Sequence, residues 1–154
     1  MNNMAHGHHL RLGRHSLAGQ IYLVTMVTGQ RQPVFADLYA ARALIGVLRE
    51  EERLERALTW AFVLMPDHLH WLMQLGTKVS LSGCVQGVKS MCSRRMGRSV
   101  WQAGFHDRAL RREEDMRSVA RYIVANPLRA GLAEDLGSYP HWDARWMRGD
   151  HDPL

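Results

Sequence analysis

Residues 58–75 read LTWAFVLMPDHLHWLMQL, two apolar runs on either side of a Met-Pro-Asp turn. Short runs of aliphatic, aromatic and β-branched residues that flank a turn signal are typical of a β-hairpin. The stretch therefore predicts a strand over residues 58–64, a tight turn, and a second strand over residues 68–75.

The sequence before this hairpin predicts one strand and one helix. Residues 20–28, QIYLVTMVT, are β-branched and aromatic, which favours a strand. Residues 36–56 place leucine and valine near helical spacing, and Asp37 is a suitable N-cap. Gly29 and Pro33 predict the turn that joins the two segments.

The sequence after the hairpin predicts two helices and a short strand. Ser80 is a candidate N-cap for the first helix. Pro127 ends the second helix, because the residue before a proline avoids the helical region. The predicted segments are a helix over residues 81–96, a strand over residues 104–111, a helix over residues 113–125 and a loop-like tail, LGSYPHWDARW, over residues 136–146.

The resulting order, β-α-β-β-α-β followed by a helix, predicts an α+β fold of the ferredoxin-like split βαβ type. We expect an antiparallel sheet with helices on one face, and an extra C-terminal helix that carries Tyr122. The other sheet face would then be partly free for a site. With no internal repeat or linker, we expect one domain over residues 20–146. Residues 1–19 are expected to form a basic arm, either a flexible grip on DNA or a disordered tail, and residues 147–154 a C-terminal tail.

Arginine supplies most of the positive charge of the 154-residue chain. The formal net charge is +5, and only Lys78 and Lys89 are lysines. Guanidinium groups pair with phosphate in two places and stack on bases, so this bias favours a nucleic-acid partner; a solvated surface explains it equally well. No apolar run approaches the ~20 residues that span a membrane, and residues 1–14 lack the apolar region of a secretory signal. We therefore expect a cytoplasmic protein.

The predicted strand over residues 68–75 carries a His-x-His pair. Side chains alternate across a strand, so His68 and His70 point to one face and Leu69, Trp71 and Met73 to the other. The two imidazoles can therefore converge on one divalent ion and leave positions open for substrate oxygens. An isolated pair of this kind is more often structural.

A second segment that contains candidate functional residues is ARYIVANPLRAGL, residues 120–132. Tyr122 and Asn126 are four residues apart and share a helix face. Met116 and Ile123 belong to the neighbouring apolar stripe. Taken alone, Tyr122 is typical of a half-buried packing residue and Asn126 of a residue at a helix C-terminal turn.

Together, MPDHLHWL and ARYIVANPLRAGL resemble the single-tyrosine HUH transposases, specifically those associated with repetitive extragenic palindromes in bacteria. GQIYLVTMVTGQRQPVF and WQAGFHDRALR also resemble that family's pattern, in the right order. The resemblance covers roughly residues 20–142. His-hydrophobe-His alone is a weak signal, whereas four segments in order are a strong one.

The resemblance implies an active site and a reaction. His68 and His70 correspond to the histidines of the HUH motif, and Tyr122 to the nucleophile. Asn126 matches a third metal ligand, although it is shorter than the glutamine that related insertion-sequence transposases have there. The implied metal is Mg²⁺ or Mn²⁺, while bare imidazole pairs would equally suit zinc or nickel. The implied reaction is cleavage and joining of single-stranded hairpin DNA through a 5′-phosphotyrosine link, by a monomer rather than a dimer.

Arginines near these motifs are candidates for contacts with DNA phosphates, which position a protein but do not specify sequence. Each of them has an alternative role in a solvated surface or an ion pair. The candidates are Arg94, Arg95, Arg98, Arg108, Arg111, Arg112, Arg121 and Arg129. His106 lies in the FHDR segment, where relatives have tyrosine, and no catalytic role is assigned to it. The competing hypotheses are a non-catalytic single-strand nucleic-acid-binding module on the same fold and a small metal-binding protein.

Overall fold

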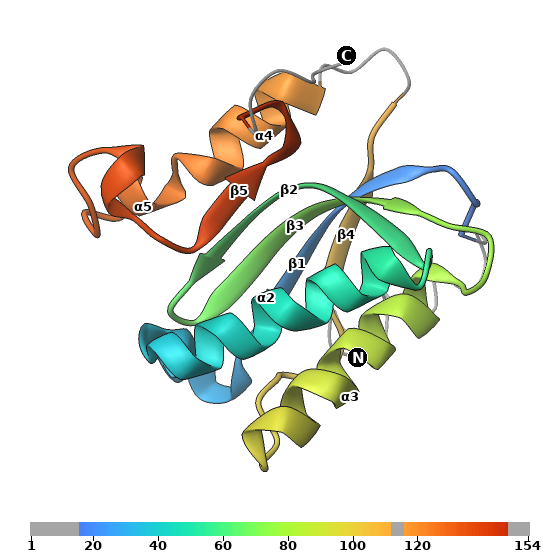
Figure 1. Ribbon diagram of the computed structural model, residues 1–154, viewed down its shortest axis with the longest axis horizontal. Helices are drawn as coiled ribbons and strands as arrows, with labels where there is room; N and C mark the ends of the chain where they lie inside the picture. Colours follow the sequence, from blue (N-terminus) through green and yellow to red (C-terminus); the bar gives the residue numbers. More distant parts are fainter. Residues whose placement is uncertain (1–15, 112–115, 148–154) are drawn as a thin grey trace, which may run out of the picture.

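A five-stranded antiparallel sheet forms the centre of the protein, as the computed structural model, which describes residues 16–111 and 116–147, shows (Figure 1). The strand order is β4-β1-β3-β2-β5, so β3 lies in the middle of the sheet. The strands are β1 (Ile21–Val27), β2 (Ala57–Met65), β3 (His68–Leu75), β4 (His106–Ala109) and β5 (Trp142–Ala144). This arrangement confirms the predicted α+β class with an antiparallel sheet.

Helices lie on both sides of this sheet. Figure 1 shows α2 and α3 side by side over one face, while α4 and α5 lie beyond β2 and β5. The α-helices are α2 (Leu38–Arg53), α3 (Leu81–Met96), α4 (Met116–Val124) and α5 (Asn126–Arg129). Short 3-10 helices occupy Gly29–Arg31, Val34–Ala36, Leu136–Ser138 and Arg145–Met147. None of the helices in the described ranges has both the length and the apolar character needed to cross a membrane.

Local chemistry fixes the N-terminal ends of the two long helices, as predicted. The Asp37 carboxylate accepts a hydrogen bond from the Ala40 backbone N–H at 2.9 Å, and the Ser80 hydroxyl accepts one from the Gly83 N–H at 3.0 Å. Both satisfy backbone donors that have no partner within a first helical turn. Gly97 ends α3 in the left-handed conformation at φ 72°, where glycine has no steric penalty.

The alternation of side chains along β3 divides the apolar residues into two cores. Leu69, Trp71 and Met73 pack into the larger core under α2 and α3. Leu72 projects the other way, into a smaller core shared with residues such as Ile123 of α4. The face that carries His68 and His70 is therefore the face on which α4 lies.

One prediction was wrong, and one predicted helix end differs from the structure by a single residue. The tail predicted as loop-like contains β5, whose residues pair with β2 from Ala61 to Val63. Three residues are too few to show an alternating pattern, and β5 forms because the edge of β2 offers free backbone groups. The predicted helix over residues 113–125, described only from Met116 onward, ends at Val124.

A second short helix then begins at Asn126, where the sequence had predicted a helix end. Pro127 lies in its first turn, where a missing N–H costs nothing because that N–H would have had no helical partner. Asn126 is therefore at the start of α5 and not in the last turn of α4.

Candidate active site

The two histidines of β3 lie side by side on the face that α4 partly covers. Their ring centroids are 4.8 Å apart, and the rings meet edge to face at 79°. The His68 side chain is 17% exposed, and His70 is partly buried. Strand alternation correctly predicted that the two rings share a face and lie opposite Trp71.

Each ring is oriented by a hydrogen bond at Nδ1. His68 Nδ1 lies 2.7 Å from Asp67 Oδ1, and His70 Nδ1 lies 2.9 Å from Thr25 Oγ1 on β1. Within residues 16–111 and 116–147, no hydrogen bond engages Nε2 of either ring. When Nδ1 carries the proton, it donates to these oxygens and leaves the Nε2 lone pair available to a metal.

Asp67 holds its position through several contacts. Its carboxylate accepts a hydrogen bond from Arg31 Nε at 3.0 Å, and its backbone carbonyl accepts one from the Thr28 N–H at 3.0 Å. Burial by itself would raise the pKa of Asp67, but the hydrogen bond with His68 and the charge of Arg31 outweigh it and lower that pKa. The sequence indicated a turn residue here, with metal ligation as the less favoured option, so the contact of Asp67 with His68 was missed.

His70 is held in its neutral form. Burial is the largest cause, and the neighbouring charges of His68 and Arg129 add to it, lowering the pKa of His70 to about 4. A neutral imidazole is the form that binds metal ions. His70 therefore has a free lone pair at physiological pH.

His70 is expected to make the metal-free protein less stable as the pH falls from about 6.5 to about 4. An unfolded histidine takes up its proton near pH 6.5, whereas folded His70 takes one up only near 4. Between these values the unfolded chain binds more protons, so stability rises with pH, by on the order of 3 kcal/mol over the interval. Urea unfolding at pH 7 and pH 4.5 should show a smaller difference for His70→Asn than for wild type. His106→Asn, which alters an exposed ring, should keep the wild-type difference; equal pH dependence in all three proteins would contradict this account.

A polar row crosses the sheet at this point. His70 is directly opposite Thr25 on β1, and Thr25 is directly opposite His106 on β4. Directly opposed residues in antiparallel strands project to the same face. With strands about 4.8 Å apart, His106 lies roughly 10 Å from His70. Within this row the side chain of His106 is exposed, whereas Thr25 and His70 are partly buried.

Tyr122 is distinguished from the other tyrosines by its surroundings. The hydroxyls of Tyr22 and Tyr139 are bound to backbone groups, Leu17 N–H and Leu64 C=O respectively. Tyr39 on α2 and Tyr122 on α4 are exposed, at 72% and 67%. Only Tyr122 of these two lies on an element that packs against the histidine face of the sheet. Among residues 16–111 and 116–147, Tyr122 is therefore the exposed tyrosine on the helix that packs against the histidine side.

Arg129 joins Tyr122 to Asn126 within the tyrosine segment. Its Nη2 donates to the Tyr122 carbonyl at 2.7 Å and to Asn126 Oδ1 at 2.9 Å, and its Cζ lies 4.0 Å from the centre of the Tyr122 ring. Its charge also acts on His70. The structure thus brings Tyr122 and Asn126 together, although they belong to different helices.

The available donors suit a metal held by two imidazoles and oxygen atoms. The described ranges contain no group of three or more His, Cys, Asp and Glu side chains able to hold an ion. His68 and His70 offer two Nε2 atoms, and Asn126 offers an amide oxygen that already accepts a hydrogen bond from Arg129. The residues present therefore fit an ion bound by the protein on one side and open to substrate on the other.

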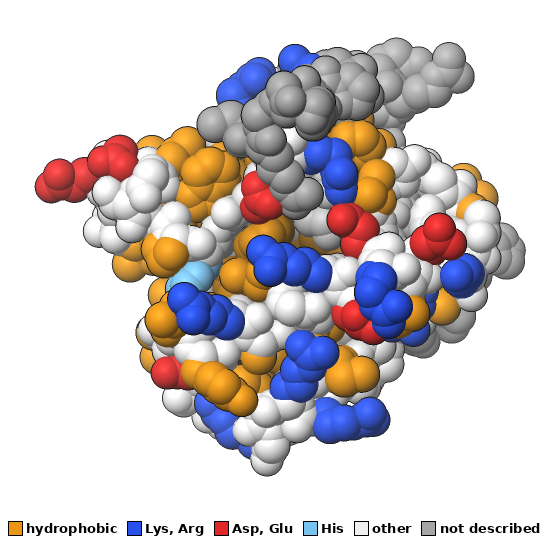
Figure 2. Space-filling model, in the orientation of Figure 1, with side chains coloured by type: hydrophobic (Ala, Val, Ile, Leu, Met, Phe, Trp, Pro, Cys, Tyr) orange, Lys and Arg blue, Asp and Glu red, His pale blue; other side chains and the backbone are white. Residues whose placement is uncertain are grey.

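The predicted arginines fall into two groups. Arg94, Arg95 and Arg98 are exposed at the end of α3, in the helix layer on the face opposite the histidines. Figure 2 shows basic side chains spread over this layer. Arg108 is opposite Leu23 and so projects to the histidine face. Arg111, Arg121 and Arg129 are exposed near β4 and α4, and Arg112 lies outside the described residues.

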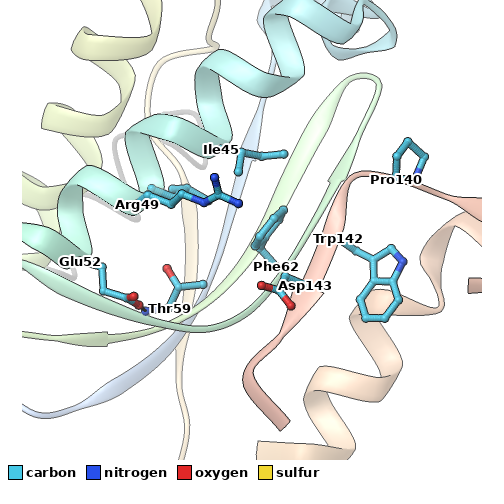
Figure 3. Close-up of a pocket in the computed structure, with 9 residues that line it drawn as sticks. Ile45, Arg49, Glu52, Thr59, Phe62, Pro140, Trp142 and Asp143 are labelled. Carbon is cyan, nitrogen blue, oxygen red and sulfur yellow. Dashed lines mark hydrogen bonds between the residues drawn. The ribbon is translucent and has the colours of Figure 1, made fainter. Parts of the chain in front are cut away.

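Two cavities lie outside the candidate site. The first, of about 130 Å³, is between α2 and the β2–β5 edge; Figure 3 shows Phe62 and Asp143 pointing into it beneath Ile45 and Arg49. The second, of about 320 Å³, is mostly apolar and lies between α4 and the C-terminal aromatic residues, including Trp146. Neither cavity is lined by His68, His70 or Tyr122.

Known proteins are similar to this chain in sequence and in fold. The REP-associated tyrosine transposase of Escherichia coli (strain K12) is 28% identical over 83 residues, which are 52% of this chain and 50% of that protein. The chain thus matches about half the length of this curated relative. A solved REP-associated tyrosine transposase bound to a REP hairpin superposes with a TM-score of 0.69 at 24% identity, covering 84% of this chain and 79% of that one. A crystal structure from Deinococcus radiodurans R1 gives a TM-score of 0.52 at 21% identity, covering 71% and 92%.

The family itself follows from a broader match. The family model described as "Transposase IS200 like" matches residues 16–126, which include β1 to β4, both histidines, Tyr122 and Asn126. The resemblance drawn from the four sequence segments is thereby confirmed. The chain belongs to the IS200-like transposase family.

Proposed function

We propose that this protein is a metal-dependent single-strand DNA endonuclease and strand transferase that acts on hairpin DNA through Tyr122. The observation that supports this most directly is the arrangement of one face of the sheet. It combines two histidines, oriented by Asp67 and Thr25, with an exposed tyrosine on α4, the helix that packs against the same face.

In the proposed reaction, the Tyr122 hydroxyl attacks a phosphodiester phosphorus. The new bond joins Tyr122 Oη to phosphorus, and the bond from phosphorus to the 3′-oxygen breaks. The phenolic proton is lost to solvent, and the departing 3′-oxygen gains one. The product is a 5′-phosphotyrosine and a free 3′-hydroxyl, and attack by the 3′-hydroxyl of another strand reverses the step and joins the strands.

A tyrosine hydroxyl is a weak nucleophile at neutral pH and needs assistance. His68, His70 and Asn126 would hold the divalent ion, Mg²⁺ or Mn²⁺, that polarises the phosphate and offsets the charge developing on its oxygens. The two neighbouring imidazoles would hold the ion on the histidine face. Packing of Ile123 into the core that includes Leu72 keeps the tyrosine helix on the same side of the sheet.

Hairpin DNA is the proposed substrate because a solved structure similar in fold is bound to a REP hairpin and because this chain carries a surplus of arginine. Exposed Arg108 and Arg111 lie near the histidine face and are placed to contact its phosphates. We propose that the protein works as a monomer, with all of these residues supplied by one chain.

The test is formation of a covalent adduct. Purified protein is incubated with hairpin-bearing single-strand oligonucleotides labelled at the 3′ end, with Mn²⁺, Mg²⁺ or EDTA, and analysed on a denaturing gel. A 5′-phosphotyrosine link retains the 3′ fragment, so a metal-dependent labelled band at the mass of protein plus fragment is expected. The same oligonucleotide labelled at its 5′ end should give a shorter free strand and no adduct. Binding without any adduct across a broad set of hairpins would instead favour the non-catalytic nucleic-acid-binding module.

Replacing Thr25 with valine is expected to weaken metal binding without unfolding the protein. Valine keeps the shape of threonine but removes the oxygen that orients His70 Nδ1. Loss of a group that orients a metal-binding histidine typically costs about 10- to 100-fold in metal affinity. Calorimetric titration with Mn²⁺ would measure this change. Thr77→Val, at an exposed position just after β3, is the matched control, and equal affinities for the two variants would contradict the role of Thr25.

A further inference from the structure

Within the described part of the chain, Arg129 contacts the two residues of the tyrosine segment that the proposed reaction uses, Tyr122 and Asn126. One nitrogen, Nη2, donates to the Tyr122 backbone carbonyl and to Asn126 Oδ1. The guanidinium carbon lies 4.0 Å from the centre of the Tyr122 ring, within the range of a cation–π contact. Because Nη2 makes both hydrogen bonds, Nε and Nη1 are the donors that remain for a DNA phosphate.

The first contact completes the end of α4. The last four carbonyls of a helix have no N–H partner within the helix, and α4 ends at Val124. The Arg121 carbonyl accepts a hydrogen bond from the Ala125 N–H. The next carbonyl, that of Tyr122, accepts one from Arg129. Arg129 therefore fixes the turn that carries the tyrosine.

The other contacts fix the two side chains. Stacking on the guanidinium restricts the ring of Tyr122, which is otherwise 67% exposed and free to change rotamer. The hydrogen bond to Asn126 Oδ1 orients the amide. Arg129 itself is on α5, and Pro127 restricts the backbone in the first turn of that helix. The Arg129 side chain therefore extends from a restrained backbone.

We propose that Arg129 is a positioning residue that holds the Tyr122 ring and the Asn126 amide as one unit toward the histidine face. This role differs from the DNA contact expected from the sequence. It rests on the proposed function only for its effect on cleavage, because the geometry itself exists without DNA or metal. Organising a nucleophile before substrate arrives lowers the cost of reaching the reactive arrangement.

The first test observes the tyrosine ring in protein free of metal and DNA. With ¹³C-labelled tyrosine the four rings give separate signals, and Tyr122→Phe identifies the signal of Tyr122. Arg129→Met keeps an unbranched side chain and removes the donors and the charge. It should shift the Tyr122 ring signals and leave those of Tyr39 in place, while Arg129→Lys, which keeps the charge, should shift them less. Unchanged Tyr122 signals in Arg129→Met would overturn the proposal.

The second test separates positioning from DNA binding. Single-turnover adduct formation at saturating hairpin DNA should fall about 10- to 100-fold in Arg129→Met, as for loss of other groups that orient reacting side chains, with partial recovery in Arg129→Lys. DNA affinity should change no more than in Arg49→Met, which removes an exposed arginine on α2. A loss of affinity with a wild-type rate at saturation would show that Arg129 is a phosphate contact and overturn the proposal. If wild type itself forms no adduct, the proposed function fails, and the ring signals still decide the role of Arg129.

Discussion

Replacing Tyr122 with phenylalanine is expected to abolish the covalent protein–DNA adduct while leaving hairpin binding intact. The substitution removes only the hydroxyl oxygen that would bond to phosphorus. The ring can still stack on Arg129, and the carbonyl of residue 122 can still accept from its guanidinium, so the local structure is preserved. Removing an enzyme nucleophile lowers rates by several orders of magnitude, about 10⁴-fold or more.

Tyr39→Phe is the matched control for this experiment. Tyr39 is about as exposed as Tyr122, but it lies on α2, on the other side of the sheet. The control should form adduct at the wild-type rate. Both variants should unfold at the same urea concentration as wild type. If the adduct still formed in Tyr122→Phe and was lost in Tyr39→Phe, the nucleophile would be on α2 and not on α4. That result would contradict the proposed role of Tyr122.

Replacing His70 with alanine is expected to lower metal-dependent cleavage by about 10²- to 10³-fold, the usual cost of losing one group that stabilises transition-state charge. His70 lies inside β3, whereas His68 is the first residue of that strand. The contact of His70 Nδ1 with Thr25 leaves Nε2 for the ion. The loss should appear both in Mn²⁺ affinity, measured by calorimetry, and in the rate of adduct formation. Raising the Mn²⁺ concentration should recover part of the rate.

His106→Ala controls for the loss of an imidazole on the same face. His106 lies in the same row across the sheet, two strands from His70, and its ring is exposed. Its removal should leave Mn²⁺ affinity unchanged. Wild-type metal affinity and rate in His70→Ala, with losses in His106→Ala, would mean that the metal is bound nearer β4 than β3.

Local rules of the sequence predicted much of the fold and half of the candidate site. Alternation along β3 predicted that His68 and His70 share a face, because the geometry of a strand depends on few residues at a time. The caps at Asp37 and Ser80 were predicted for the same reason. These features need no knowledge of distant parts of the chain.

The missed features depend on contacts made only in the folded chain. The strand β5 exists because β2 has a free edge, and its three residues carry no pattern of their own. The contact of Asp67 with His68 requires the turn to be held by Arg31. The role of Arg129 requires α5 to turn back onto α4, which the break at Ala125 and the proline after Asn126 allow. Spacing alone had indicated that Tyr122 and Asn126 share a face, and Arg129 is what joins them.

The division of the apolar side chains into two cores has a consequence for how the molecule opens. The histidines lie on the central strand, which is paired on both sides and buried against the larger core. The tyrosine lies on a nine-residue helix that covers only the smaller core. Segments with fewer buried contacts open more readily by local unfolding. Amide hydrogens of α4 should therefore exchange with deuterium well before those of β3. The helix that carries Tyr122 could then detach while the strand that carries His68 and His70 stays folded.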